Sequence, residues 1–306
     1  MQMIKFILTS MLLWSFGWGK YALIVEERLG EGIEVSALAM ESSGKQIALG
    51  CSDGGVRIVG IPSGRVELIL KGHASPVSAL AFLDGETLLS GDRGGEMRRW
   101  NLKLQEGEVW PERSLEARGA VRAIAAQEGF YAATFENHTL EYQDREGKKH
   151  SLFYPRNFQM IGWRGSSLYL LGWDRRLRVV EAQSGKETLE REHSDEVLAS
   201  AYCAYRDDLL VADAGRRVWK IPFDSKKPSQ EVGMVEFSPS ALACDPFEKG
   251  VWIGGSQGEV IFWGEGGVKE FLGEMRSGGV RGLFAPSEGI LVGISWEGRV
   301  VVWKKL

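Results

Sequence analysis

Cysteine is scarce in this sequence of 306 residues, and its cysteines lie far apart. Cys51, Cys203 and Cys244 form no close-spaced pair, which excludes a disulfide framework like that of small secreted domains. No Cys-x-x-Cys pair or closely spaced set of cysteine and histidine occurs, so no zinc site is expected. With an apolar content of 44%, the chain can instead bury a large hydrophobic core.

Histidine is also rare, and motifs that usually accompany catalysis are missing. The four histidines are His73, His138, His150 and His193. They form no His-Glu-x-x-His zinc motif, and no glycine-rich phosphate loop is present. We therefore expect a protein that is not an enzyme and that uses no metal and no cofactor.

The sequence lacks a strong excess of charge of either sign. Its formal net charge is −4, from 37 basic and 41 acidic residues, so no overall field attracts nucleic acid or an anionic membrane. Proline is infrequent, with nine residues, whereas glycine and tryptophan number 39 and 11. This composition favours many short strands joined by tight turns, and hence an all-β fold.

Long apolar runs are absent after the first residues of the chain. Phe6 to Trp18 is a run of about 13 mostly apolar residues, too few for a transmembrane helix, which needs ~20. Lys5 precedes this run and small residues end it, so we interpret residues 1–19 as a signal peptide. We expect residues 20–306 to be exported, to the periplasm in a Gram-negative host, without stable membrane insertion. A protein that stays inside the cell is the alternative.

Seven copies of one apolar segment organise the rest of the chain. They begin near residues 35, 77, 121, 159, 197, 240 and 280. Each is followed by a second apolar run, a tight turn and a third strand with a recurring large apolar position. That position holds Val59, Trp100, Tyr142, Val180, Trp219, Trp263 and Trp303. Four short strands per unit of about 40 residues predict a seven-bladed β-propeller of four-stranded antiparallel blades.

The two ends of the chain complement each other in this pattern. Six units continue into a fourth, more polar strand, such as residues 65–72 or 108–117, but the seventh stops at Leu306 after its third strand. Residues 21–30 precede the first unit and have the content of a strand. We predict that they complete the last blade and close the ring, because an open ring would leave unpaired β edges.

The second unit carries the clearest family motif. It has a Gly-His dipeptide at His73, an apolar strand containing Ser90, and a strand that ends in Trp100 and Asn101. With these residues the chain resembles a divergent WD-repeat β-propeller. The resemblance implies that His73 and Ser90 are structural, and that the tryptophans of the third strands fill the blade cores.

The sequence departs from the WD-repeat pattern at several positions. Aspartate never follows the recurring position of the third strand, and Glu192-His193 is the sole further remnant of a Gly-His dipeptide. The buried aspartate of the family's tight turn corresponds to Asp53 in the first unit but to Gly94 in the second. We therefore predict an incomplete side-chain hydrogen-bond network in the second blade.

The repeat register also bears on the cysteines. It puts Cys203 and Cys244 near the ends of neighbouring inner strands. We expect three buried thiols that act as small hydrophobic groups, and a single bridge between these two residues is the alternative.

Arginines gather in the turns between second and third strands, which a propeller places on one face. With two nearby tryptophans they are candidate partner-binding residues, although solvation alone is the alternative. These residues are Arg93, Arg175, Arg176, Arg216, Arg217, Trp173 and Trp296.

The predicted channel lining argues against an enzyme. The inner strands are rich in alanine, glycine and serine, and their charged residues are Arg122, Arg281 and, at a strand end, Asp245. Two arginines do not make a calcium site. A small-molecule or metal-binding enzyme that uses the channel is kept as an alternative.

The resemblance implies a scaffold that binds other proteins, with an acidic partner suggested by the arginines. We expect a monomer on its own and no binding of nucleic acid. Exported propellers without catalytic residues resemble accessory factors of periplasmic respiratory enzymes, including a nitrate-reductase accessory protein of WD-repeat type, and outer-membrane assembly factors, and the sequence does not separate these. An intracellular WD-repeat scaffold is the remaining alternative.

Overall fold

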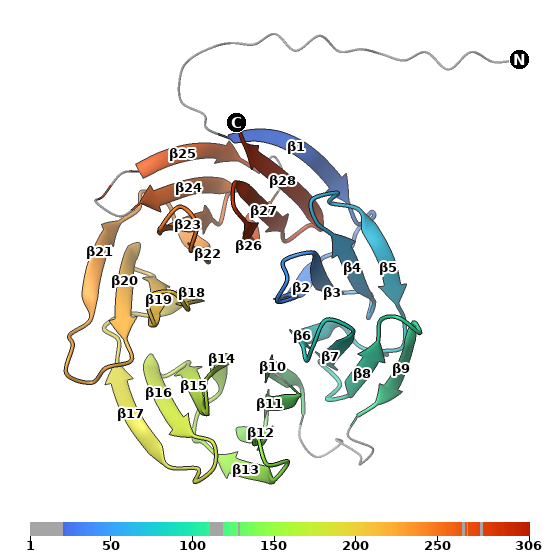
Figure 1. Ribbon diagram of the computed structural model, residues 1–306, viewed down its shortest axis with the longest axis vertical. Coiled ribbons are helices and arrows are strands. Elements are labelled where there is room, and N and C mark those ends of the chain that lie inside the picture. The colour runs from blue at the N-terminus through green and yellow to red at the C-terminus, as the bar shows by residue number, and fades with distance from the viewer. Residues whose placement is uncertain (1–20, 111–118, 128, 265–266, 268, 276–277) are drawn as a thin grey trace, which may run out of the picture.

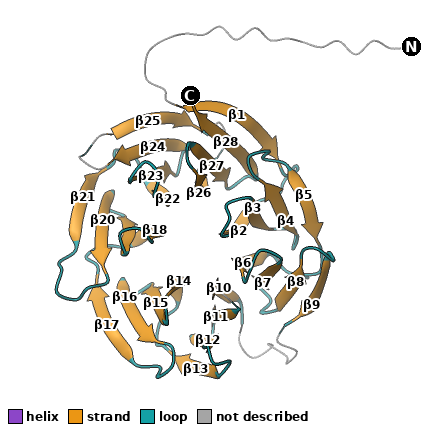
Figure 2. Cartoon of the chain, in the orientation of Figure 1, coloured by secondary structure: helices purple, strands orange, loops and turns teal. Residues whose placement is uncertain are grey.

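Alternating apolar residues separated by glycine-rich turns form short strands throughout the chain. The computed structural model describes residues 21–110, 119–127, 129–264, 267, 269–275 and 278–306. In these residues the strands form seven sheets of four strands, arranged as blades around a central axis (Figure 1). Strands and loops account for all of the described chain (Figure 2). The predicted all-β, seven-bladed propeller is confirmed.

The blades follow one another in the order of the sequence, each running from an inner to an outer strand. Blade one consists of β2 (Val35–Met40), β3 (Gln46–Cys51), β4 (Val56–Gly60) and β5 (Val66–Leu70). Blade two consists of β6 (Val77–Phe82), β7 (Thr87–Asp92), β8 (Met97–Asn101) and β9 (Glu106–Val109). Blade three consists of β10 (Val121–Gln127), β11 (Phe130–Phe135), β12 (Thr139–Gln143) and β13 (Lys149–Phe153). Blade four consists of β14 (Phe158–Arg164), β15 (Ser167–Gly172), β16 (Arg176–Glu181) and β17 (Glu187–Glu192).

The remaining three blades complete the circle. Blade five consists of β18 (Val197–Cys203), β19 (Asp208–Asp213), β20 (Arg217–Pro222) and β21 (Gln230–Met234). Blade six consists of β22 (Pro239–Asp245), β23 (Gly250–Gly255), β24 (Glu259–Gly264) and β25 (Lys269–Glu274). Blade seven consists of β26 (Val280–Ser287), β27 (Ile290–Ser295), β28 (Arg299–Lys305) and β1 (Tyr21–Arg28).

The inner strands begin at the predicted residues or one residue earlier. The fourth strand of blade two begins earlier than predicted, because β9 starts at Glu106 and not at residue 108. The Asn101 side chain accepts a hydrogen bond from the Leu104 amide at 2.9 Å and closes a tight turn after β8. The chain therefore enters β9 two residues early, and residues 111–117 of the prediction lie outside the described residues, as does the predicted signal peptide.

The N-terminal strand closes the ring, as predicted. β1 pairs antiparallel with β28, from Tyr21 opposite Lys305 to Arg28 opposite Arg299. An ion pair between Glu26 and Arg299 supports the same edge. Figure 1 shows β1 as the outer strand of the last blade, beside the C-terminus. The edge of β28 is thus paired instead of open to another chain.

Each blade packs face to face against the next through a layer of apolar side chains. Between blades one and two, for example, Ile58 and Leu70 lie in one cluster with Val77, Leu88 and Trp100. The four third-strand tryptophans occupy these layers: Trp100, Trp263 and Trp303 are buried and Trp219 is half-buried. Burial of 150–250 Å² per tryptophan is worth several kcal/mol at about 25 cal/mol/Å², which makes this packing the main source of stability.

Close approach of blades requires glycine on the second strand. A side chain at Gly50 would collide with Val77 of the next inner strand, and one at Gly91 would collide with Val121 in the same way. Their absent side chains let the first valine of each following blade sit against the strand.

A disulfide joins Cys203 of β18 to Cys244 of β22, with their Cα atoms 5.4 Å apart. The expectation of three thiols is therefore wrong for this pair, because neighbouring inner strands bring both side chains to the same end of the channel. Cys51 is free and buried, and burial raises the pKa of its thiol to about 11. No helix in the described part of the chain is long and apolar enough to cross a membrane.

Removal of residues 21–30 should expose the edge of β28 and lower the melting temperature by at least about 5 °C, or cause aggregation. Differential scanning calorimetry and light scattering measure both effects. Leu23→Ser is the control, since Leu23 is 49% exposed and its strand pairing would remain. A truncated chain that melts like the full chain would contradict ring closure by β1.

Reduction of the disulfide should lower the free energy of unfolding by about 4 kcal/mol. The intact bond closes a long loop in the unfolded chain and so limits the conformational entropy of the unfolded state. Thermal melts with and without a thiol reductant test this. The double variant Cys203→Ala, Cys244→Ala should not respond to reductant, whereas Cys51→Ala should respond as fully as the parent. Equal melts of the parent in both buffers would contradict the bond.

Candidate functional site

The turns between second and third strands all lie at one end of the blades. In every blade the first amide of this turn donates a hydrogen bond to the carbonyl that precedes the inner strand. The pairs are Ser52–Glu34, Arg93–Pro76, Glu136–Ala120, Trp173–Asn157, Ala214–Glu196, Ser256–Ser238 and Trp296–Gly279. We call this side of the ring, formed by these seven turns and the starts of the inner strands, the turn face.

The predicted arginines lie on the turn face, as the repeat indicated. Arg93, Arg175 and Arg216 are exposed in the turns, and Arg176 and Arg217 are half-buried at the starts of β16 and β20. The structure thus brings them to one surface, although their role in binding a partner stays a prediction.

Glutamates of the same blade neutralise the arginines of blade four. Arg176 pairs with Glu190 at 2.5 Å and with Glu192 at 3.2 Å, and Arg175 approaches Glu192 at 3.7 Å. Such exposed pairs contribute little to stability but cancel local charge. Blade four is therefore a weaker candidate for binding an acidic partner than sequence reasoning suggested.

Blades two and five keep positive charge open to solvent. Arg93 and Arg217 make no ion pair with the residues that the structure describes. Arg216 donates a hydrogen bond to the backbone carbonyl of Glu236 at 2.9 Å and likewise has no carboxylate partner among them. These three side chains carry the unpaired charge of the turn face in these blades.

A cavity of about 740 Å³ occupies the central channel. The predicted lining of small residues is incomplete, since Leu38, Met40, Met160, Leu198 and Phe284 also border the cavity. An inner strand is the edge of its blade, so side chains from both of its faces reach the channel. Most side chains of the resulting wall are apolar, although polar atoms also contribute to its surface.

Charged groups at the cavity are few. Glu196 and Arg281 border it, and the exposed Trp173 lies at its rim. Asp245 does not take part, because it is buried and accepts hydrogen bonds from the Trp252 indole at 2.8 Å and from two turn amides. Sequence reasoning named Arg281 but missed Glu196, which lies one residue before an inner strand.

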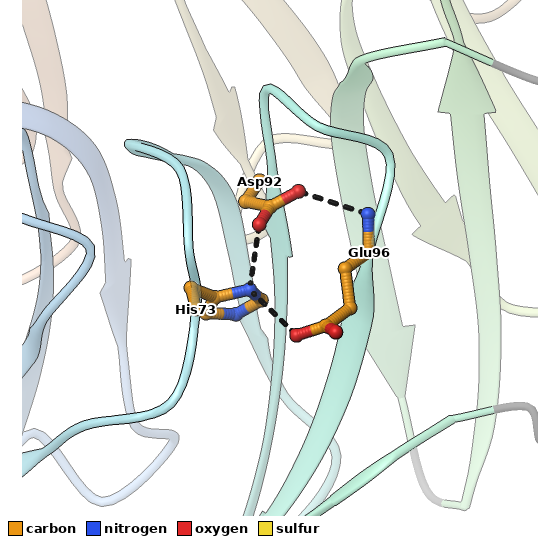
Figure 3. A group of neighbouring side chains, drawn as sticks. All are labelled: His73, Asp92 and Glu96. Atoms are coloured by element: carbon orange, nitrogen blue, oxygen red, sulfur yellow. Dashed lines mark hydrogen bonds and ion pairs between the residues drawn. The ribbon is translucent and has the colours of Figure 1, made fainter. Parts of the chain in front are cut away.

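A buried network connects four side chains of blade two (Figure 3 shows its acidic end). The Trp100 indole donates to Ser90 Oγ at 2.7 Å, and Ser90 Oγ lies 2.5 Å from His73 Nε2. His73 Nδ1 lies 3.2 Å from Asp92 Oδ2, and Asp92 Oδ1 accepts the Glu96 amide at 2.8 Å. Desolvation lowers the pKa of His73, which favours the neutral ring.

The prediction of an incomplete network in blade two is therefore wrong. Gly94 does hold the family's aspartate position, but Asp92, two residues earlier at the end of β7, reaches the same histidine. The strand end and the turn are close enough in space that either position can supply the carboxylate. The sequence does contain an aspartate beside this turn, Asp92, but it lies two residues before the position that the family pattern assigns to the aspartate.

The same cluster has the geometry of a candidate metal site, since ligand atoms of His73, Asp92 and Glu96 lie within 4.8 Å of one another (Figure 3). The hydrogen bonds argue against this use. Both carboxylate oxygens of Asp92 are already hydrogen-bonded, one with His73 and one with the backbone amide of Glu96. Glu96 Oε1 lies 2.5 Å from Arg98 Nε. A cation would have to displace these bonds, so the residues fit a structural network better than a metal site.

Related networks occur in other blades in altered form. His193 Nε2 lies 3.2 Å from Asp213 Oδ2, which also accepts the Trp219 indole at 2.8 Å, so His193 makes a contact in blade five like that of His73 in blade two. In blade one Asp53 has no histidine and instead pairs with Arg57 at 2.6 Å. The hydrogen bonds from Arg57 hold the pKa of the Asp53 carboxyl below its usual range.

The expectation that the sequence holds no nucleophile-elbow motif is wrong at one place. Gly254 to Gly258 reads Gly-Gly-Ser-Gln-Gly, which matches the Gly-x-Ser-x-Gly pattern. A nucleophile turn of that type leads from a strand into a helix, whereas these residues join β23 to β24 in a hairpin. The match is therefore an ordinary turn of blade six.

Comparison with known proteins agrees with this architecture. Residues 64–101 match the family described as WD domain, G-beta repeat. That segment spans most of blade two and contains the complete network. The crystal structure of the Cps50 (Swd1) β-propeller domain from Myceliophteria thermophila is similar, with a TM-score of 0.73 and 16% sequence identity. The similarity covers 93% of this chain and 99% of that chain, and it supports the fold alone. No curated protein matches the sequence.

Replacement of Ser90 by alanine should cost about 2–4 kcal/mol, because it leaves the Trp100 indole and His73 Nε2 buried without partners. Urea unfolding followed by tryptophan fluorescence measures the loss. Thr134→Val is the matched control. This threonine is also buried, but its hydroxyl has no hydrogen-bond partner in the described part of the chain, so its removal should be neutral or stabilising. Similar losses for both variants would show that the network contributes nothing.

Proposed function

We propose that this chain is a non-catalytic scaffold that binds another protein on its turn face, outside the cytoplasm. A WD-repeat propeller fits a protein-interaction scaffold, and proteins of this family are generally scaffolds without catalytic activity. The observation that carries the proposal is the gathering of unpaired arginines and exposed tryptophans on one face. Trp173 and Trp296 are 62% and 45% exposed, and such aromatic and arginine side chains are frequent in binding hot spots.

The partner should present an acidic surface. Arg93, Arg216 and Arg217 offer positive charge that the described residues do not neutralise, and a complementary acidic patch would increase the rate of association. Because the arginines of blade four are paired within the blade, we place the ionic part of the contact over blades two and five, and its apolar part at the exposed indoles of Trp173 and Trp296.

Export is supported by two features of different kind. The apolar segment from Phe6 to Trp18 has the composition of a signal peptide, and the Cys203–Cys244 disulfide is a bond typical of oxidising compartments. An accessory role to a respiratory enzyme such as nitrate reductase stays a prediction.

Charge reversal on the turn face tests the proposal. The double variant Arg93→Glu, Arg216→Glu should reduce the recovery of a co-purifying partner from the exported fraction by at least about 10-fold at low salt. Quantitative mass spectrometry of the purified complex measures that recovery.

Lys226→Glu, Lys227→Glu is the matched control, because it makes the same charge change in the exposed loop between β20 and β21, at the other end of the blade. Its recovery of partner should equal that of the parent. Equal recovery with the turn-face variant, or a chain that recovers no partner at all, would refute the proposed function.

A further inference from the structure

Two arginines occupy the same position in different blades, the second residue of the inner strand. Arg122 of β10 pairs with Glu136 at 2.5 Å, and Glu136 is the first residue of the turn in blade three. The equivalent turn residue in blade seven is Trp296, whose ring centroid lies 4.5 Å from the guanidinium carbon of Arg281. Blade three therefore neutralises its arginine with a carboxylate, whereas blade seven stacks its arginine on an indole.

The guanidinium of Arg281 is largely buried and has few partners. Nη2 donates to the Ser36 carbonyl at 2.6 Å, but the enclosed Nε has no acceptor, and Nη1 makes no hydrogen bond with the described residues. Desolvation lowers the pKa of this arginine, and no carboxylate of the described residues forms an ion pair with it. A desolvated charge without a counter-ion is unfavourable, so this position lowers the stability of the unbound protein.

The surroundings of Arg281 are suited to a ligand with an acidic and an apolar part. Arg281 borders the 740 Å³ channel cavity, whose wall includes Leu38, Met160 and Phe284. A carboxylate can form two parallel hydrogen bonds with a guanidinium, and the apolar wall can receive the groups beside it. A free inorganic anion would satisfy the charge but would leave this wall and the exposed indole of Trp296 uncovered.

We propose that the channel cavity binds a segment of the partner protein in which an aspartate or glutamate is flanked by apolar residues. Arg281 binds the carboxylate, and Trp296 holds the guanidinium in place by stacking on it. Glu196, which borders the same cavity, disfavours a second acidic residue in the segment. This inference rests on the proposed scaffold function and assigns the chemistry of one of its contacts.

Selection from a random peptide library on the full chain provides the probe. A selected peptide with one acidic residue is compared with its twin, in which that residue is asparagine or glutamine, by fluorescence anisotropy. The acidic peptide should bind about 10- to 100-fold more tightly than the twin, because a hydrogen bond between two charged groups contributes more binding free energy than one to a neutral amide. Sodium acetate and inorganic phosphate, added as competitors, test whether a free anion alone occupies the site.

Three variants locate the binding. Arg281→Met should weaken binding of the acidic peptide by about 10- to 100-fold and abolish its advantage over the twin. Trp296→Glu should do the same, because it supplies Arg281 with an internal carboxylate like that of blade three. Arg122→Met is the control and should change affinity less than about 2-fold, since that arginine is already neutralised by Glu136.

Melting temperatures separate binding from a structural role. Arg281→Met should melt at the same temperature as the parent or higher, because it removes a desolvated charge. The inference would be overturned by a marked fall in the melting temperature of Arg281→Met, or by selected peptides that contain no acidic residue. It would also be overturned if Arg281→Met bound the acidic peptide as tightly as the parent does, or if phosphate alone displaced the peptide. In each of these cases partner recovery by Arg93→Glu, Arg216→Glu still decides the scaffold function independently.

Discussion

The antiparallel pairing of β1 with β28 is the interaction on which the ring depends. Each blade packs against the next in sequence, so six of the seven contacts between blades join neighbouring stretches of chain. The seventh joins the two ends: Val35, Ile47 and Leu49 of blade one lie in one apolar cluster with Val292 and Val300 of blade seven. β1 holds blade seven complete beside this contact, and the loop after β1 leads directly into the first inner strand.

The inner wall of the channel carries its own hydrogen-bond pattern between blades. At the second position of the inner strand, Ser36, Ser78 and Ser240 donate to the carbonyls of Val77, Val121 and Val280 of the following blade. Arg281 performs a similar bond with its Nη2 group across the junction of blades seven and one. A serine at this position links its blade to the next by one hydrogen bond. Arg281 at the same position makes a comparable hydrogen bond and also carries a charge without an ion-pair partner among the described residues.

The sequence predicted the blades well because each strand depends on local alternation and each turn on local glycine. It also predicted ring closure, because the last unit lacks a fourth strand and the segment before the first unit is a strand without a partner of its own. It failed where a contact depends on position in space. Asp92 takes the place of the family aspartate in the second unit, although it lies two residues earlier in the sequence. The register left a bridge between Cys203 and Cys244 as an alternative to free thiols, and the structure has this bridge.

The candidate site shows the same division. Repeat register placed the arginines on one face, but it did not reveal that Glu190 and Glu192 neutralise those of blade four. Nor did it pair Arg281 with Trp296, because Trp296 lies in the turn after β27 and is brought beside the start of β26 by the pairing of Val280 with Ser295. Charge on a surface depends on such pairings, which a single sequence does not display.

The disulfide has a geometric consequence for the channel. Among the junctions between blades, the one between five and six contains a covalent bond at the channel wall, where the Cα atoms of Cys203 and Cys244 are held 5.4 Å apart. This part of the circumference cannot widen. A guest that needs more space must obtain it by small shifts of the opposite wall, around β2, β6 and β10, where the blades are joined by serine hydroxyls and packed side chains.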